Sequence, residues 1–333
     1  MKTKFNLRKL TSSREMSLVI VFIILCAFVQ LRNNTFLTAG TLEGLFKNYA
    51  VTMIMALGMM CVLLIGGIDI AVGSTLGFSG MCASLFLRDY PQLPVIAVFL
   101  ISIAIGTACG LIIGLVVAYG KVPPIIATLG GMYIFRGLAY LVAKNEWVSA
   151  YQFTDSYKNF AQARYLGFGV VNNLIVLTIL IYILFFVFLK WTRLGRKIYA
   201  VGSNPEAAEI SGIKIKTVKV MCYAILGFLT GLCGCLYTSL YASAQGDMGT
   251  SLEMDVIAAC VVGGVSLSGG RGSVIGVFLG ALIMAIVGKT LPLIGVSQFW
   301  QTAMKGIIII AAVILNVLAQ RAMDKKQRKE REM

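Results

Sequence analysis

Long apolar runs, separated by short polar breaks, dominate the chain from one end to the other. Most of them approach the ~20 residues that a helix needs to cross a bilayer. The pattern therefore predicts an all-α fold, a polytopic membrane bundle of about ten transmembrane helices in a single domain over residues 1–333. The expected spans are roughly 16–32, 48–66, 70–88, 94–119, 123–143, 169–189, 218–241, 254–268, 273–290 and 298–319.

The composition agrees with a membrane protein. Hydrophobic residues make up 58% of the chain and charged residues 13%, whereas a soluble domain carries about 25% charged residues. The mean hydropathy is +0.86. The first apolar run follows a basic segment, as in a signal peptide, but no small-residue cleavage pattern follows it. We therefore expect this run to be retained as the first helix.

Basic residues gather in three polar segments, which lie at 1–15, in the central loop 190–217 with its flank, and at 320–333. Loops rich in Lys and Arg remain on the cytoplasmic side of a membrane. With ten crossings, both termini and the central loop reach that side together. The basic charge is thus explained by orientation, and we do not expect it to bind nucleic acid.

The central loop also predicts a short helix. Asn204 is a good N-cap, Pro205 suits the first helical position, and Gly212 is a typical terminator. A short helix on the cytoplasmic face needs a surface to pack against, and a groove on a partner protein would provide one. The candidate contact residues are Gly195, Arg196, Asn204, Pro205, Glu206, Ala207, Ala208 and Gly212.

Two spans end in glycine-rich breaks of similar sequence, at 66–74 and 263–272. They are either tight turns at the cytoplasmic face or broken helices beside a pathway, because non-helical backbone in lipid must be buried by protein or line a watery cavity. Close packing or positive φ should explain the glycines at 67, 73, 264 and 270. The pathway or hinge candidates in the breaks are Gly66, Gly67, Asp69, Gly73, Ser74, Gly263, Gly264, Gly269 and Gly270.

Few ionisable residues lie inside the spans, and each is a candidate for function because intramembrane charge is costly. Asp69 is placed to cap the following helix. Arg136 and Lys305 could pair with carboxylates or reach carbonyl groups, and we count both as pathway candidates. Glu253 and Asp255 stand at a span edge.

The loops expected outside lie at 33–47, 89–93, 144–168, 242–253 and 291–297, and the longest of them, 144–168, is polar and aromatic. It is either an amphipathic loop in the membrane interface, where aromatic residues are favoured, or a docking or gating surface. Trp147 and Tyr151, with Glu253 and Asp255, are the outer docking candidates.

Glycines spaced by four predict close helix contacts. They are Gly106, Gly110 and Gly114 in one span, and Gly276 and Gly280 in another. The eight cysteines all lie in apolar runs, and we interpret them as packing residues.

The sequence contains no histidine, which makes a metal site or a Ser–His–Asp site improbable. Gly288-Lys289-Thr290 resembles the end of a phosphate-binding loop, but position 283, where that motif needs glycine, is Ile283. We therefore expect that the chain is not an enzyme and binds no cofactor of its own.

Five stretches carry a family resemblance: GGIDIAVGS (66–74), IIATLGGMYIFRGL (125–138), LGRKIYAVGSNPEAAEISGI (194–213), LEMDVIAACVVGGVSLSGGRG (252–272) and LIGVSQFWQTAMKG (293–306). Together they resemble the permease subunits of bacterial ABC importers for monosaccharides, of the ribose, galactose, xylose and autoinducer-2 type. The similarity covers nearly the whole chain in order. Ala71, where the family more often has serine, and Lys289–Leu291 depart from it, and both weaken the transfer of a particular sugar.

The resemblance implies a multi-pass protein of the bacterial cytoplasmic membrane that works as a dimer of identical or homologous permeases. A cytoplasmic ABC ATPase using ATP and magnesium would drive it through the helix at 204–212, and an extracytoplasmic sugar-binding protein would deliver a pentose, a hexose or an autoinducer-2-like sugar. The alternatives are an ion-coupled secondary transporter, for which Asp69 is a thin basis, and a non-transporting membrane scaffold.

Overall fold

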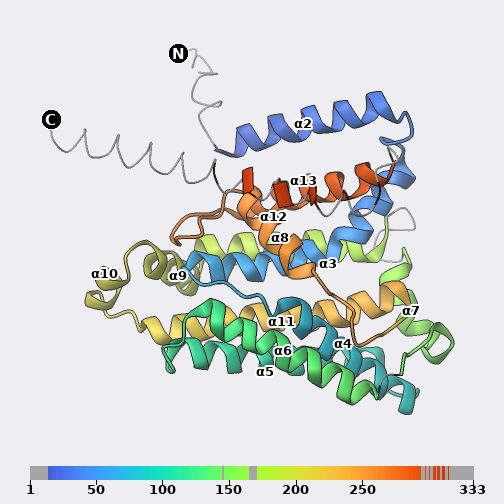
Figure 1. The fold of residues 1–333 in the computed structure, drawn as a ribbon, viewed down its shortest axis with the longest axis horizontal. Helices are drawn as coiled ribbons and strands as arrows, with labels where there is room; N and C mark the ends of the chain where they lie inside the picture. The colour runs from blue at the N-terminus through green and yellow to red at the C-terminus, as the bar shows by residue number, and fades with distance from the viewer. Residues whose placement is uncertain are drawn as a thin grey trace.

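The computed structural model describes residues 14–144, 146–164 and 171–293, with scattered positions between 297 and 314. The described part is a bundle of roughly aligned helices with a single isolated antiparallel bridge, Val148 to Ala244 (Figure 1). Its elements are α2 (Arg14–Arg32), α3 (Ala39–Leu64), α4 (Val72–Asp89), α5 (Val95–Ala118), α6 (Pro124–Ala143), η1 (Ala150–Gln152), α7 (Asp155–Gln162), α8 (Asn173–Trp191), α9 (Arg193–Ser203), α10 (Pro205–Ile210), α11 (Ile215–Tyr241), α12 (Leu252–Val262) and α13 (Val274–Leu293).

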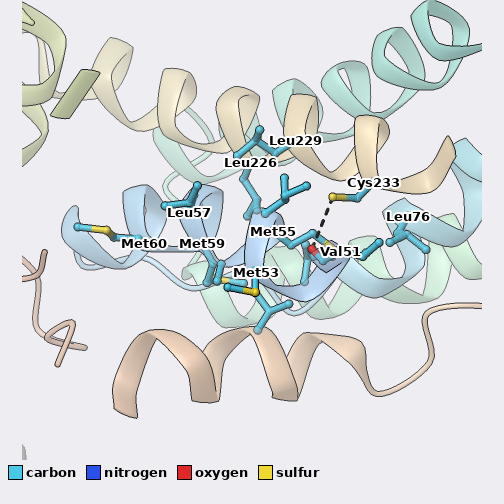
Figure 2. Close-up of a cluster of buried hydrophobic side chains, with 14 of the residues drawn as sticks. Val51, Met53, Met55, Leu57, Met59, Met60, Leu76, Leu226, Leu229 and Cys233 are labelled. Atoms are coloured by element: carbon cyan, nitrogen blue, oxygen red, sulfur yellow. Dashed lines mark hydrogen bonds between the residues drawn. The ribbon is translucent and has the colours of Figure 1, made fainter. Parts of the chain in front are cut away.

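Helix α3 forms the centre of the core. Every residue from Ala50 to Leu64 is buried, because α3 is apolar on all sides and other helices surround it. Figure 2 shows Met53 and Met59 on the side of α3 that points away from Leu226 and Leu229 of α11. In the same view the thiol of Cys233 donates to the carbonyl of Val51 over 3.6 Å. All eight cysteines are free thiols, and seven of them are buried.

The glycines spaced by four lie in close helix contacts, as predicted. On α5, a Cβ added at Gly106 would stand 2.5 Å from the Gly227 carbonyl oxygen and 2.6 Å from the Cα of Gly231, both in α11. The Ser102 hydroxyl adds a 2.7 Å hydrogen bond to the carbonyl of Gly231. The pair on α13, Gly276 and Gly280, likewise packs against the end of α12 and against Gly263, which follows it. Close backbone approach is thus what joins these helices.

Within the described residues, six helices are long and apolar enough to cross a membrane. They are α2 from Glu15 onward, α3, α5, α6, α8 and α11. The chain is therefore a multi-pass membrane protein, while the count of about ten crossings stays a prediction. Most of the expected tenth span, 298–319, lies outside the described residues.

The expected span over 254–268 is wrong in its extent. Helix α12 ends at Val262 after 11 residues, which rise about 16 Å, roughly half of the ~30 Å hydrocarbon layer. The segment 242–251 belongs to the expected outside loop 242–253 and leads into α12 through a series of turns, in which the N–H of Met248 donates to the Gln245 carbonyl and that of Thr250 to the Asp247 carbonyl. Figure 1 shows it as an orange trace that runs from the neighbourhood of α7 back to the middle of the bundle.

The bundle has two distinct ends (Figure 1). We call one the hairpin end, where α9 and α10 lie, and the other the α7 end. The start of α2 belongs to the hairpin end, because the Ser273 hydroxyl, next to the second glycine-rich break, donates to the Glu15 carboxylate over 2.9 Å. The start of α2 and the polar loop between α8 and α11 therefore lie at the same end of the bundle.

Candidate functional site

The predicted short helix of the central loop is confirmed as α10. The side chain of Asn204 accepts a 3.0 Å hydrogen bond from the backbone N–H of Ala207, and Pro205 occupies the first position. At the other end Gly212 has φ +79°. Its N–H donates to the Glu209 carbonyl, and that of Ile213 donates to the Ala208 carbonyl. These bonds form a Schellman motif, in which glycine is preferred because φ is positive.

Helix α10 is exposed on nearly its whole surface. Ala208 is its single buried residue, at 4% exposure, whereas Glu206 and Ala207 face solvent. Ile210 is 89% exposed, the largest value among the exposed large hydrophobic residues of the described chain. An isolated apolar side chain on a rigid, capped helix is a suitable contact for a partner protein.

The preceding helix, α9, is fixed to the membrane bundle. The Thr192 hydroxyl accepts a hydrogen bond from the N–H of Gly195, and Arg196 donates to the Trp191 carbonyl at the end of α8. The hydroxyl of Tyr199 donates to the carbonyl of Gly272 over 2.8 Å. Partial burial raises the pKa of Tyr199 to about 12, so this phenol stays protonated and keeps its donor.

Both glycine-rich breaks are tight turns with the same local structure. After α3 the N–H of Gly67 donates to the Val62 carbonyl, and after α12 the N–H of Val265 donates to the Cys260 carbonyl. In each turn the preceding glycine, Gly66 or Gly264, has positive φ. The similar sequences of the two breaks thus specify two equivalent Schellman motifs.

The two turns meet each other and α9. The N–H of Gly270 donates to the carbonyl of Leu64 over 2.8 Å. A Cβ added at Gly202 would overlap that same carbonyl and would lie 2.6 Å from the Gly270 nitrogen. Gly202 of α9 therefore touches the end of α3 and the second turn at once, through backbone atoms alone.

The four glycines expected to need close packing or positive φ do so. Gly264 and Gly270 have positive φ. A Cβ at Gly67 would stand 2.8 Å from the Tyr223 hydroxyl, and a Cβ at Gly73 would strike the carbonyl of Gly249. These contacts explain why glycine occupies each position, while a hinge role stays a prediction.

Asp69 does not cap the following helix, so that prediction is wrong. Its carboxylate accepts a 2.8 Å hydrogen bond from the N–H of Ala71, but Ala71 is itself the N-cap of α4 and lies before the first helical turn. The helix begins at Val72 with the Ser74 hydroxyl bonded to the Ala71 carbonyl. Asp69, which is 4% exposed, stabilises the turn that leads to α4.

Arg136 reaches carbonyl groups, one of the two outcomes foreseen for it. Its Nη1 donates to the carbonyls of Gly246 and Met248, both at 2.8 Å. Arg136 stands seven residues before Ala143, where α6 ends, or about 10 Å along that helix. The 242–251 segment therefore descends between the helices to this depth. Lys305, the other basic candidate, lies outside the described residues.

The 242–251 segment has unusual backbone geometry. Ala242 and Ser251 have φ of +47° and +66°, and Gly249 has φ +74°. Positive φ is uncommon for residues other than glycine, and such strain persists where the surrounding structure enforces it, often at functional sites. No sequence signal except the polar composition of this segment could have revealed its path.

The loop 144–164 covers the α7 end and is joined to the 242–251 segment. Val148 and Ala244 exchange two 3.0 Å backbone hydrogen bonds. Helix α7 is anchored on α11 by its buried Tyr157, whose hydroxyl lies 2.7 Å from the Thr238 hydroxyl. Trp147 and Tyr151 of this loop are 65% and 85% exposed, so both aromatic side chains are available to a partner.

Glu253 and Asp255 do not lie with these aromatic residues. Both are half-buried in the first turn of α12, and a Cβ at Gly73 would stand 2.5 Å from the Glu253 carboxylate. Gly73 is near the start of α4, whereas Arg88, at its end, forms an ion pair with Glu146 of the loop. Fifteen residues of helix, about 22 Å, separate the two places.

The described residues hold no cluster of three or more metal-ligating side chains. A bundle of membrane-crossing helices that contains a half-length helix and a non-helical segment between the helices is an architecture of membrane transport proteins. The chain belongs to the family described as branched-chain amino acid transport system / permease component, whose model matches residues 41–313.

Curated relatives agree over most of the chain. The ribose import permease protein RbsC of Haemophilus influenzae is 38% identical over 298 residues, which cover 89% of this chain and 90% of that protein. RbsC of Bacillus subtilis is 39% identical, with 88% and 89% covered. The galactose/methyl galactoside import permease protein MglC of Escherichia coli is 37% identical, with 93% and 96% covered. No solved structure matches the chain significantly. These relatives confirm the resemblance to monosaccharide permeases.

Proposed function

We propose that this chain forms the translocation pathway of an ABC importer for a monosaccharide and that a separate ATPase subunit drives it. The family description names branched-chain amino acids, but the curated relatives that cover about nine-tenths of the chain are named for ribose and galactose. We therefore favour a ribose-like pentose or a hexose over an amino acid.

The observation that supports this function most strongly is that α10 is exposed and yet joined to the helix bundle through α9. This helix presents Ile210 and the exposed residues around Glu206 to a partner, and α9 connects it through Gly202 to the end of α3 and to the turn that follows α12. A push on α10 would reach both glycine-rich turns through backbone contacts. We assign Gly195 and Arg196 to the attachment of α9, and α10 to the contact with the ATPase.

We further propose that the hairpin end is cytoplasmic. Six of the seven basic residues between Lys190 and Lys219 are exposed there, and excess basic charge favours the cytoplasmic side. Single cysteines in place of Ser203 and Ser156, both exposed, should react with impermeant thiol reagents from opposite sides. Labelling of both from one side would contradict this orientation.

The proposal includes several partners. A second permease, identical or homologous, completes the pathway in the bacterial cytoplasmic membrane. An extracytoplasmic binding protein delivers the sugar, and we assign Trp147 and Tyr151 to its docking surface. ATP and magnesium belong to the ATPase, and we assign no cofactor to this chain.

Reconstituted vesicles test the function. The complex of this chain, its ATPase and its binding protein should take up labelled D-ribose or D-galactose only when ATP reaches the ATPase. Ionophores that collapse proton and sodium gradients should leave uptake unchanged. Uptake that persists without ATP and stops with ionophore would establish the ion-coupled alternative instead.

A further inference from the structure

A polar pocket of about 380 Å³ opens where α11 ends and the 242–251 segment begins. This volume lies at the small end of the ~300–1,000 Å³ typical of small-molecule sites. Its side chains with polar groups are Tyr237, Tyr241, Ser243, Gln245, Asp247 and Thr250. None of them was a candidate from the sequence.

We propose that this pocket binds the sugar ring during its passage through the permease. The class of ligand rests on the proposed function, while the site itself rests on the geometry of the pocket. The assignment gives a substrate-contacting role to the end of α11 and to the segment that follows it.

The two tyrosines supply a surface for the apolar face of a sugar. The rings of Tyr237 and Tyr241 lie 4.6 Å apart at their centroids and are tilted by 52°. The face of an aromatic ring is electronegative and attracts the weakly positive C–H groups of a sugar ring, while the phenol hydroxyl remains able to form hydrogen bonds. Tyr241 is 48% exposed, so its ring is accessible.

Gln245 and Asp247 supply planar groups for neighbouring sugar hydroxyls. A carboxylate accepts from two hydroxyls at once, and an amide both donates and accepts. The side chain of Asp247 is exposed, and among the described residues no ion pair engages it. Asp247 lines the pocket, and the neighbouring guanidinium of Arg136 donates to the carbonyls of Gly246 and Met248, so the carboxylate is available to a ligand.

The pocket is held in shape by groups that do not line it. Arg136 binds the carbonyls of Gly246 and Met248, on either side of Asp247. The backbone of Val148 pairs with that of Ala244, the residue before Gln245. Non-helical backbone within the bilayer is tolerated where it is buried or lines a watery cavity, and the polar side chains of this segment line the pocket.

A second cavity, of about 420 Å³ between α8 and α11, provides the contrast. Its lining is apolar and includes Phe185, Phe188 and Phe228. It offers a sugar no hydrogen-bonding group, whereas a lipid chain would fit it. Its polar lining therefore makes the pocket at the end of α11 a better site for a sugar than this apolar cavity.

Uptake by the full reconstituted complex tests the site. Tyr241→Ala and Asp247→Asn should each lower the uptake of D-ribose or D-galactose at least tenfold and change the ratio between the two sugars. Tyr241→Phe, which keeps the ring, should retain most of the uptake. ATP hydrolysis stimulated by the binding protein should stay within about twofold, because the hairpin end is untouched.

Two exposed residues away from the pocket serve as matched controls, Tyr133→Ala on α6 and Asp155→Asn on α7. They should transport normally. Normal uptake by Tyr241→Ala and Asp247→Asn in a wild-type complex that imports sugar would overturn the site alone. A wild-type complex that imports neither sugar would overturn the proposed function, and with it the ligand class.

Thiol labelling gives a second readout that does not depend on transport. Thr250 is exposed, so Thr250→Cys should react with impermeant thiol reagents, and D-ribose or D-galactose should slow the reaction. Seven of the eight native cysteines are buried and should contribute little to the labelling. An unreactive thiol in a folded complex would show that water does not reach the pocket and would overturn the proposal.

Discussion

The two ends of the bundle are held together by different kinds of contact. At the hairpin end, backbone touches backbone, and Gly202 packs on Leu64 and Gly270. Toward the α7 end, side chains such as Arg136 hold the non-helical 242–251 segment by its carbonyl groups. Contacts between backbone atoms cannot relax through a change of side-chain rotamer, so the hairpin end suits the transfer of a displacement. The second end fixes the backbone and leaves side chains available to a ligand.

The largest effect should follow from filling the backbone contact of α9. In Gly202→Val the new side chain would overlap the Leu64 carbonyl, and forced overpacking costs about 1–3 kcal/mol or more. We expect at least a hundredfold loss of uptake, about 2.7 kcal/mol, together with a lower Tm in detergent.

Gly137→Val is the matched control for this change. Gly137 is also helical, on α6, but a Cβ there would meet nothing within 4 Å. It should transport at nearly the normal rate. Equal activity of the two variants would show that the contact at Gly202 is not rigid.

The next effect concerns the α7 end. Arg136→Gln removes the donor of two carbonyls, and each buried group left unsatisfied costs about 1–3 kcal/mol. Water in the pocket offsets part of this cost, so we expect a tenfold to thirtyfold loss of uptake with normal ATP hydrolysis. Arg164→Gln, which breaks an exposed ion pair with Glu43, should change uptake little. Normal uptake by Arg136→Gln would contradict the proposal that Arg136 holds the 242–251 segment in place.

A smaller effect should come from the cap of α10. Asn204→Ala removes the acceptor for the Ala207 N–H, and such a loss costs about 0.5–2 kcal/mol. We expect about a fivefold lower transport rate at normal expression. Asn204→Asp should restore the rate because aspartate caps as well as asparagine. Equal rates for the alanine and aspartate variants would exclude a contribution of the cap.

The smallest effect should belong to Asp69→Asn. Asparagine keeps an oxygen that can accept from the Ala71 N–H, the hydrogen bond that Asp69 forms, so uptake per folded complex should be close to normal. A loss above tenfold, about 1.4 kcal/mol, would mean that the negative charge itself is needed for transport.

Local patterns predicted much of the hairpin end. The cap at Asn204, the stop at Gly212 and the turn glycines Gly66 and Gly264 all lie where their backbone preferences indicate. These features depend on a few neighbouring residues, so the sequence contains the information directly.

Features that depend on distant partners could not be predicted in this way. The contact of Gly202 with Leu64 and the descent of the 242–251 segment join elements far apart in the chain. A polar segment between apolar runs is normally a surface loop, which is how we interpreted 242–251. The N-cap predicted at Asp69 was misplaced by two residues, because α4 starts at Val72 and its N-cap is Ala71.

The central claim is that α10 receives the work of the ATPase, and the number of sugar molecules imported per ATP hydrolysed measures it most directly. Glu206→Lys and Ala207→Trp alter the exposed face of α10, and Asp155→Lys is a matched charge reversal in the first turn of α7. We predict that the α10 variants lower this ratio at least tenfold or release the ATPase, while the permease stays folded and Asp155→Lys behaves as wild type. An unchanged ratio in a normally assembled complex would contradict the account.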